Sequence, residues 1–168
     1  AFAGQFIFGN APKLCDVRAV FGVIDVAAAG QLIAALADAD SAVRYWAGLG
    51  LLMRQAPAVS TAREYLLDAL SDPYASVRVT AAEALGRYGS GPDIDTALEV
   101  LLEHAVVQVN GEFIAMLAVA ALDAMDERAL GVQDRIAAID TTGGTGTRPT
   151  AREVERLIVK TLADLGAR

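Results

Sequence analysis

An internal repeat constrains the fold of this chain more than any other feature of its sequence. Residues 32–54 align with residues 66–88 at a shift of 34, and identical residues recur along both segments. The identical pairs are Leu32 and Leu66, Ala35 and Ala69, Leu36 and Leu70, Asp38 and Asp72, Val43 and Val77, Arg44 and Arg78, Ala47 and Ala81, and Leu51 and Leu85. A repeat of this period is typical of a solenoid, in which each copy buries its apolar face against the next one.

Each copy has the pattern of two antiparallel helices. Apolar residues recur at helical spacing on both sides of a short polar segment, which is residues 38–41 in one copy and residues 72–74 in the other. Pro73 cannot continue the preceding helix because it has no backbone amide donor. A hydrophobic content of 54% with only 6% aromatic residues also fits closely packed helices. The sequence therefore predicts an all-α fold, an α-solenoid of antiparallel helical hairpins with about three to four units.

Less regular copies of the unit extend the predicted solenoid. Residues 94–104 and 112–125 are the predicted helices of a third hairpin, joined near Asn110 and Gly111. Residues 129–139 and 151–165 are those of a last hairpin. In front of the repeated pair, residues 13–29 are interpreted as the second helix of a partial first unit.

Local signals place several helix starts. Thr61 with Glu64, and Thr150 with Glu153, have the spacing of a capping box, so we expect helices to begin there. Pro92 follows Gly89-Ser90-Gly91 and is expected near the start of the third hairpin.

The predicted domain organisation is an irregular segment, residues 1–12, followed by one solenoid domain, residues 13–168, with a flexible loop at residues 140–149. The irregular segment is rich in phenylalanine, with Phe2, Phe6 and Phe8. Two interpretations stay open. The segment either caps the open end of the stack or contacts a partner, which includes a second copy of the chain in a homodimer.

Charge and composition narrow the classes of partner. The net charge of -7 and a pI near 4.6 disfavour binding to nucleic acid, because the phosphate backbone is also negative. Charges or glycines interrupt the apolar runs before they reach the roughly 18 to 20 residues that a membrane span needs, so we expect a soluble protein without one. The single cysteine, Cys15, fits a cytoplasmic location slightly better than an oxidising compartment but identifies neither.

The repeated motif Asp-x-x-x-x-Val-Arg, present at residues 38–44 and 72–78, resembles that of short bacterial HEAT-repeat proteins. These are related to the HEAT-like modules named after phycobilin lyases. The resemblance implies that Val43 and Val77 are core residues. It also implies that a polar ladder joins successive hairpins, and its members would be Asp38, Arg44, Asp72 and Arg78.

A narrower resemblance connects residues 32–165 with the helical tail that follows the catalytic domain of some bacterial sulfatases. It depends on the strings DSAVRYWAGLGLLMR, SVRVTAAEALGRYG and LIVKTLADL. The sulfatase nucleophile belongs to a Cys-x-Pro-x-Arg motif, whereas Cys15 lies in Lys-Leu-Cys-Asp-Val-Arg. No catalytic residue is therefore transferred to this chain.

Candidate chemical groups are few. His104 is the only histidine and has no partner for a zinc site or a nucleophile pair, so we expect it to be solvated at a helix end. Four carboxylates at helical spacing are interpreted as a solvated acidic face. They are Asp93, Asp95, Glu99 and Glu103. The sequence predicts no catalytic, cofactor-binding or metal-binding residue.

Two adjacent aromatic residues, Tyr45 and Trp46, are candidates for a contact surface. Neighbouring side chains on a helix point about 100° apart, so both cannot be fully buried on one narrow face. The alternative is that Trp46 packs between hairpins while Tyr45 covers the edge.

Together these features favour a non-catalytic scaffold that binds a protein or a neighbouring domain. The alternative is the C-terminal module of a sulfatase-like hydrolase whose catalytic domain is absent from this chain. A phycobilin lyase-like or chaperone role is a weaker alternative, because it depends on fold-level analogy.

Overall fold

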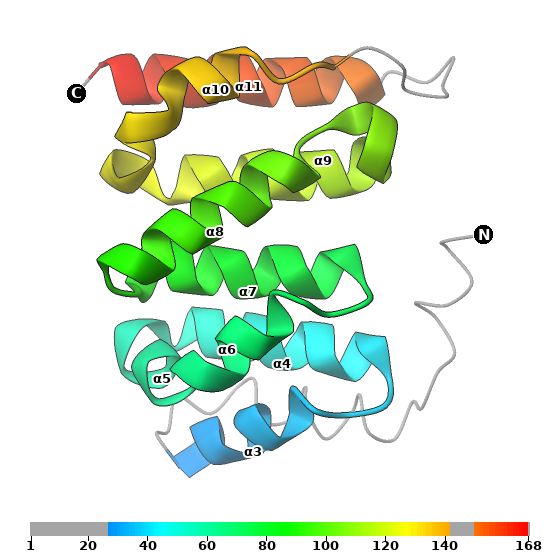
Figure 1. Cartoon of the computed structure of the whole chain (residues 1–168), viewed down its shortest axis with the longest axis vertical. Helices are drawn as coiled ribbons and strands as arrows, with labels where there is room; N and C mark the ends of the chain where they lie inside the picture. The colour runs from blue at the N-terminus through cyan, green and yellow to red at the C-terminus, as the bar shows by residue number, and fades with distance from the viewer. Residues whose placement is uncertain (1–26, 142–149, 168) are drawn as a thin grey trace.

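The computed structural model describes residues 27–141 and 150–167 of the chain. Its helices form a stack of four hairpins in two layers (Figure 1). The first helices of the hairpins form one layer, and the second helices form the other. The described residues contain helices and turns but no strand, so the predicted all-α solenoid is confirmed.

The first two hairpins follow the repeat. The first consists of α3 (Ala27–Ala35) and α4 (Ser41–Met53). The second consists of two short helices, α5 (Gln55–Thr61) and α6 (Arg63–Ala69), followed by α7 (Ala75–Tyr88). Asp40 caps α4 because its carboxylate accepts the backbone amide of Ala42 at 2.9 Å.

The last two hairpins are less regular. The third consists of α8 (Gly91–His104) and α9 (Val107–Ala124), and the fourth of η1 (Asp126–Val132), α10 (Gln133–Ala137) and α11 (Thr150–Gly166). The predicted link near Gly111 is a break inside α9, where this residue has a φ of +77°. Glycine tolerates that left-handed conformation because it has no Cβ.

Two sequence predictions about helix starts and lengths are wrong. Thr61 ends α5 and its hydroxyl donates to the Pro57 carbonyl, so it does not cap α6 with Glu64. The predicted helix over residues 129–139 is instead a 3₁₀ helix followed by the short α10. The second predicted cap residue, Thr150, is where α11 begins, and its side chain lies outside the described residues.

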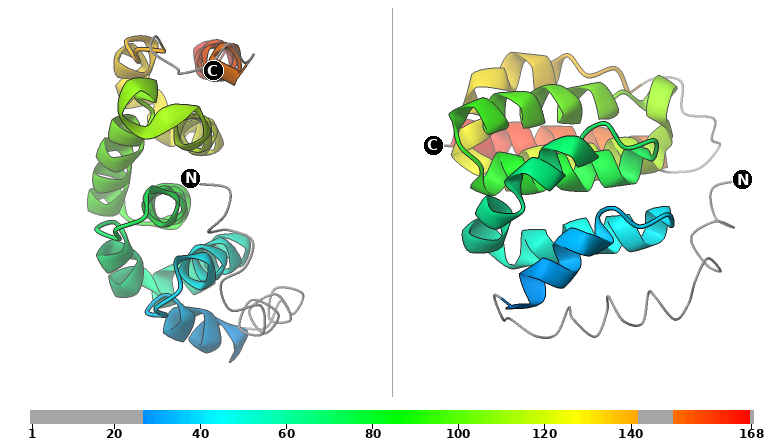
Figure 2. Two further views of the ribbon diagram at one scale, coloured as in Figure 1. Left: turned by 90° about the vertical axis from the view of Figure 1, so that its right-hand side faces the viewer. Right: turned by 60° about the horizontal axis from the view of Figure 1, so that its bottom comes forward.

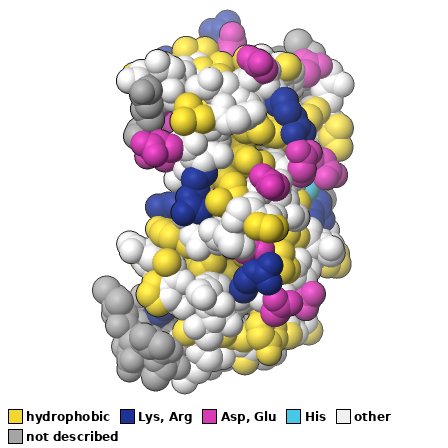
Figure 3. Space-filling model, turned by 60° about the vertical axis from the view of Figure 1, so that its left-hand side comes forward, with side chains coloured by type: hydrophobic (Ala, Val, Ile, Leu, Met, Phe, Trp, Pro, Cys, Tyr) yellow, Lys and Arg dark blue, Asp and Glu magenta, His cyan; other side chains and the backbone are white. Residues whose placement is uncertain are grey.

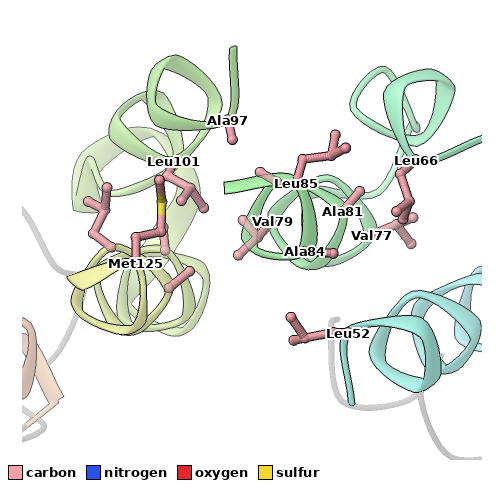
Figure 4. Close-up of a cluster of buried hydrophobic side chains, with 14 of the residues drawn as sticks. Leu52, Leu66, Val77, Val79, Ala81, Ala84, Leu85, Ala97, Leu101 and Met125 are labelled. Atoms are coloured by element: carbon pink, nitrogen blue, oxygen red, sulfur yellow. The ribbon is translucent and has the colours of Figure 1, made fainter. Parts of the chain in front are cut away.

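The core lies between the two layers and is continuous along the stack. Equivalent positions of successive repeats share the same burial, as in Leu51, Leu85 and Val119, each 0% exposed. Leu85 of α7 lies between Leu66 of α6 and Leu101 of α8 (Figure 4). Each hairpin therefore shares its apolar face with its neighbours, which is how a solenoid gains its stability.

The second helices α4, α7, α9 and α11 run parallel to one another and lie on the inner side of a curved stack (Figures 1 and 2). The surface of these helices that faces away from the first layer is called the inner face below. The irregular segment at residues 1–12 and most of the predicted loop at residues 140–149 lie outside the described residues. Of the partial unit predicted at residues 13–29, residues 13–26 also lie outside them, and residues 27–29 belong to α3 instead.

Candidate interaction surfaces

The polar ladder joins successive hairpins near the turn within each hairpin, called the turn end below. The contact between the first and second hairpins is called the first junction, and the contact between the second and third hairpins is the second junction. In the first junction, Arg44 on α4 donates two hydrogen bonds to the Asp72 carboxylate, 2.6 Å from Nε and 3.0 Å from Nη2. The same guanidinium donates to the Asp38 carbonyl of its own turn at 2.8 Å. The Asp38 carboxylate accepts the Asp40 amide at 2.9 Å, so it shapes its own turn.

The second junction uses a different acceptor. Arg78 donates from Nη1 to the Asp72 carbonyl at 2.6 Å, as Arg44 does to its own turn. Its Nε donates to Nε2 of His104, 2.9 Å away at the end of α8. His104 is 2% exposed, so the prediction that it is solvated is wrong. It lies at a helix end as expected, but the next hairpin buries it.

Further ionic contacts join successive hairpins away from the ladder. Asp93 on α8 accepts from both Arg63 Nε at 2.9 Å and Nη2 at 2.6 Å. It also accepts from the Ser90 amide and hydroxyl, which forms a capping box. The hydrogen bonds from Arg63, then those from Ser90, lower the pKa of Asp93 to about 2, although burial opposes them.

The predicted acidic face is therefore only partly solvated. Asp95, Glu99 and Glu103 are exposed, but Asp93 is 1% exposed, so the expectation is wrong for this residue. Glu99 pairs with Arg135 across the third junction. Acidic and basic side chains are interspersed with hydrophobic ones on the side of the molecule seen in Figure 3.

Tyr45 and Trp46 are both half-buried and pack against the core. Their rings meet edge to face with centroids 5.8 Å apart. Burial, and then the charge of Glu83 on α7, raise the pKa of the Tyr45 phenol. Burial also raises the pKa of Glu83, opposed by its 3.0 Å ion pair with Arg87. Tyr45 therefore lies at the contact between α4 and α7, and the Trp46 ring packs beside it.

More exposed apolar side chains lie on α9 and α11, the last two of the second helices. Phe113 on α9 is 64% exposed and Val159 on α11 is 63% exposed. On α9, the partly exposed Met116 and Leu117 and the exposed Ala120 follow Phe113 on the same side of the helix. These four residues of α9 are called the inner-face patch, and Val159 lies apart from them on α11. The patch was not predicted from the sequence, although Phe113 occupies the repeat position of Tyr45.

A surface pocket of about 370 Å³ lies on α11 beside Val159. It is lined by Arg152, Glu155, Arg156 and Val159, which lie on one side of α11. Arg156 pairs with Glu153 at 2.9 Å. The exposed surface is thus apolar on this side of α9, whereas charged side chains surround Val159 on α11.

The helix α9 has the length and apolar composition of a membrane span, alone among the described helices. This was not expected from the sequence. Gly111 interrupts the helix, and it packs against α7, α8 and α11. These are features of a core helix.

Several of the candidates from the sequence lie outside the described residues. They are Phe2, Phe6, Phe8 and Cys15. Within the described ranges, no group of three or more histidine, cysteine or acidic side chains could hold a metal ion.

Comparison with known families agrees with the observed stack. A family model described as HEAT repeats matches residues 29–123, which is more than half of the chain. The chain belongs to the HEAT-repeat family. No curated protein matches it. The matched region begins in α3 and ends in α9, so the fourth hairpin lies beyond it. HEAT repeats typically act as scaffolds for protein interactions.

Proposed function

We propose that this HEAT-repeat chain is a non-catalytic scaffold that binds a protein surface, on a partner or a neighbouring domain, through its inner-face patch. The observation that carries the proposal is the exposure of Phe113, which Met116, Leu117 and Ala120 follow on the same side of α9. Large exposed apolar side chains that cluster on one face are typical of interaction sites.

The helices hold the patch in a fixed position. Ile114 and Ala115, which follow Phe113, are 4% and 0% exposed and anchor α9 in the core. On α11, Ile158 beside Val159 is 7% exposed. A partner would therefore meet preordered side chains, which lowers the entropic cost of binding. Covering the exposed parts of Phe113 and Val159 would contribute on the order of 1 to 2 kcal/mol each.

The charges beside the patch indicate what kind of protein surface fits. On α11, the neighbouring second helix, Val159 lies among Arg152, Glu155 and Arg156. A complementary surface would present apolar side chains opposite Phe113 and Val159 and a carboxylate opposite Arg152. Such rim contacts set orientation and association rate more than affinity.

The test uses the tagged chain to capture proteins from an extract of the source cells. The double variant Phe113→Asp/Val159→Asp should lose the captured partner, with affinity for the purified partner reduced about thirtyfold or more. Tyr65→Asp is the matched control, because Tyr65 is 51% exposed but lies on α6 in the other layer. This control should bind as the wild type does.

Circular dichroism should show that all three proteins are equally helical. Equal binding by the double variant and the wild type would refute the inner-face patch as the binding surface. Loss of binding in Tyr65→Asp alone would move the site to the outer layer.

The neighbouring-domain form of the proposal is the one that the sulfatase resemblance suggests. Reading the source DNA upstream of the codon for Ala1 tests it. An in-frame domain with Cys-x-Pro-x-Arg would support an accessory module of a sulfatase-like hydrolase. A nearby start codon, with a native mass close to 17.5 kDa, would support a free-standing scaffold.

A further inference from the structure

Phe113 belongs to a row of equivalent apolar positions on the second helices. At the repeat shift of 34, Tyr45 on α4, Val79 on α7 and Phe113 on α9 occupy the same position. Tyr45 is half-buried and Val79 is 3% exposed, whereas Phe113 is 64% exposed. The row crosses the stack near the turn end, because each of these helices begins there. Phe113 is therefore the member of the row that leaves the largest apolar surface uncovered.

The inner-face patch that starts at Phe113 contains no charged side chain. Its other members, Met116, Leu117 and Ala120, are apolar and at least partly exposed. A charged group covered by this surface would lose its water without gaining a partner, which is costly. An apolar segment without charge is therefore the chemical match for the patch.

Residues 1–12 have this composition. They contain Phe2, Phe6, Ile7 and Phe8 and no charged side chain. These residues lie outside the described part of the chain, which begins with Ala27 at the start of α3. The patch and the segment that matches it are thus parts of the same molecule.

The repeat indicates the end of the stack from which this segment would start. The sequence predicts that residues 13–26 belong to the second helix of a partial unit. Such a helix would run parallel to α4, α7 and α9 and would end where α3 begins (Figure 1). Its first residue would then lie at the turn end. Residues 1–12 would therefore leave it at the end of the inner face where Phe113 lies.

The segment is also long enough to reach the patch. Packed helices lie about 8 to 10 Å apart, so about 30 Å would separate the predicted helix from α9, with α4 and α7 between them. Residues 1–12 span up to about 40 Å when extended. Phe2 can then reach Phe113, while Phe6 and Phe8 lie along the row.

We propose that residues 1–12 fold back over the inner face and cover the inner-face patch, with Phe2 against Phe113, so that a partner must displace them. The tether holds the segment at an effective concentration on the order of millimolar, so a weak contact is enough to cover the patch. A second copy as the occupant would have to overcome the repulsion between two chains of net charge -7. The contact itself can be measured without a partner, and only its regulatory role rests on the proposed function.

The chain has three methionines, which report on the contact separately. Met116 belongs to the patch. Met53 is 57% exposed at the far end of α4, and Met125 is 2% exposed in the core. Oxidation by hydrogen peroxide converts an accessible methionine to its sulfoxide, and mass spectrometry of the peptides gives the rate at each position.

These rates are compared in the full chain and in the triple variant Phe2→Ser/Phe6→Ser/Phe8→Ser. Met116 should oxidise at least about twofold faster in the variant, which is the ratio for a patch covered at least half of the time in the wild type. Met53 should react equally in both proteins. Met125 should react slowly in both, which shows that the variant is folded.

Photo-cross-linking locates the segment in a chain that keeps its other phenylalanines. Phe2 is replaced by the photoreactive analogue p-benzoylphenylalanine, and the cross-linked peptides are identified by mass spectrometry. The expected cross-link joins position 2 to residues 112–120 of the same chain. A cross-link to α3 would show that the segment caps the open end of the stack. A cross-link between two chains would show that a second copy is the occupant. Either result would overturn the proposal.

The oxidation rates can also overturn it. A ratio below about twofold for Met116, or equal acceleration at Met53 and Met116, would mean that the segment does not cover the patch. The capture test of the proposed function is separate. Unchanged capture by Phe113→Asp/Val159→Asp would refute the binding surface and leave the covering contact standing. If both hold, the triple variant should bind the purified partner more tightly by the factor seen at Met116, because covering lowers the apparent affinity.

Discussion

The first two junctions between hairpins have their ion pairs at opposite ends. At the turn end, the first junction has a charge pair, Arg44 with Asp72, and the second has a guanidinium that donates to an imidazole, Arg78 with His104. At the other end the order is reversed. The second junction has the charge pair Arg63 with Asp93.

The equivalent positions in the first junction, one repeat earlier, are the buried apolar residues Ala29 and Val59. Each of these two junctions therefore has one of these ion pairs, and the two pairs lie at opposite ends of the hairpins. The repeat therefore specifies the backbone and the apolar core, whereas the positions of the polar contacts differ from one junction to the next. What stays constant is the guanidinium that bonds the carbonyl of its own turn, at Asp38 or Asp72.

The largest expected effect on stability comes from a substitution in the core that both junctions share. Val77 is 1% exposed and sits where Val43 sits in the preceding hairpin. Val77→Asp would bury an unpaired carboxylate, at a cost of about 4 kcal/mol or more, against a total stability of about 5 to 15 kcal/mol. We expect loss of the helical circular dichroism signal or of cooperative unfolding.

Tyr45→Ala is the control for this change, because Tyr45 is half-buried at the edge and should be dispensable for folding. A cooperative transition in Val77→Asp at wild-type urea concentrations would mean that the assignment of this helix face is wrong.

A smaller effect distinguishes the two turn ends. The side chains of Arg44 and Asp72 are 11% and 8% exposed, so Arg44→Met leaves a nearly buried carboxylate without its cation. This should cost about 3 kcal/mol at pH 7.5. Arg78→Met leaves an imidazole nitrogen without its donor and should cost about 1 to 2 kcal/mol. Urea denaturation of both variants at pH 7.5 measures the difference, and equal losses would show that the two junctions are energetically alike.

The sequence could predict the first of these contacts better than the second. The repeat pairs Asp38 with Asp72 and Arg44 with Arg78, so a ladder is expected wherever the motif recurs. The next position for the aspartate is Val106, and the structure uses His104 instead, slightly earlier in the chain. Periodicity cannot show this, because the acceptor is defined by where α8 ends.

Other residues were missed for similar reasons. The Ser90–Asp93 spacing was a usable signal for a capping box, but its second role with Arg63 needs the neighbouring hairpin. Phe113 lies at a repeat position, yet its exposure depends on what the adjoining helices cover. The hairpins, their order and the core positions therefore follow from the sequence, whereas the polar contacts and the patch need the three-dimensional stack.

The smallest expected effect concerns acid stability at the far end of the second junction. The folded-state pKa of Asp93, about 2, lies below the ordinary value of 3.8. Its ionised form is therefore favoured by folding, and this stability is present above pH 4 and lost as the pH falls toward 2. Arg63 is partly exposed and solvent screens the pair, so we expect about 1 to 2 kcal/mol.

Asp93→Asn should lower the free energy of unfolding by this amount at pH 7 and by much less near pH 2. Glu99→Gln is the control, since Glu99 pairs with Arg135 in full contact with solvent, and it should unfold as the wild type does at both pH values. Urea titrations at the two pH values check both variants. If Asp93→Asn lost the same stability at pH 2 as at pH 7, the capping hydrogen bonds of Ser90, rather than the charge on Arg63, would be what Asp93 contributes. The second junction would then resemble the first at this end, where the first junction has the apolar residues Ala29 and Val59.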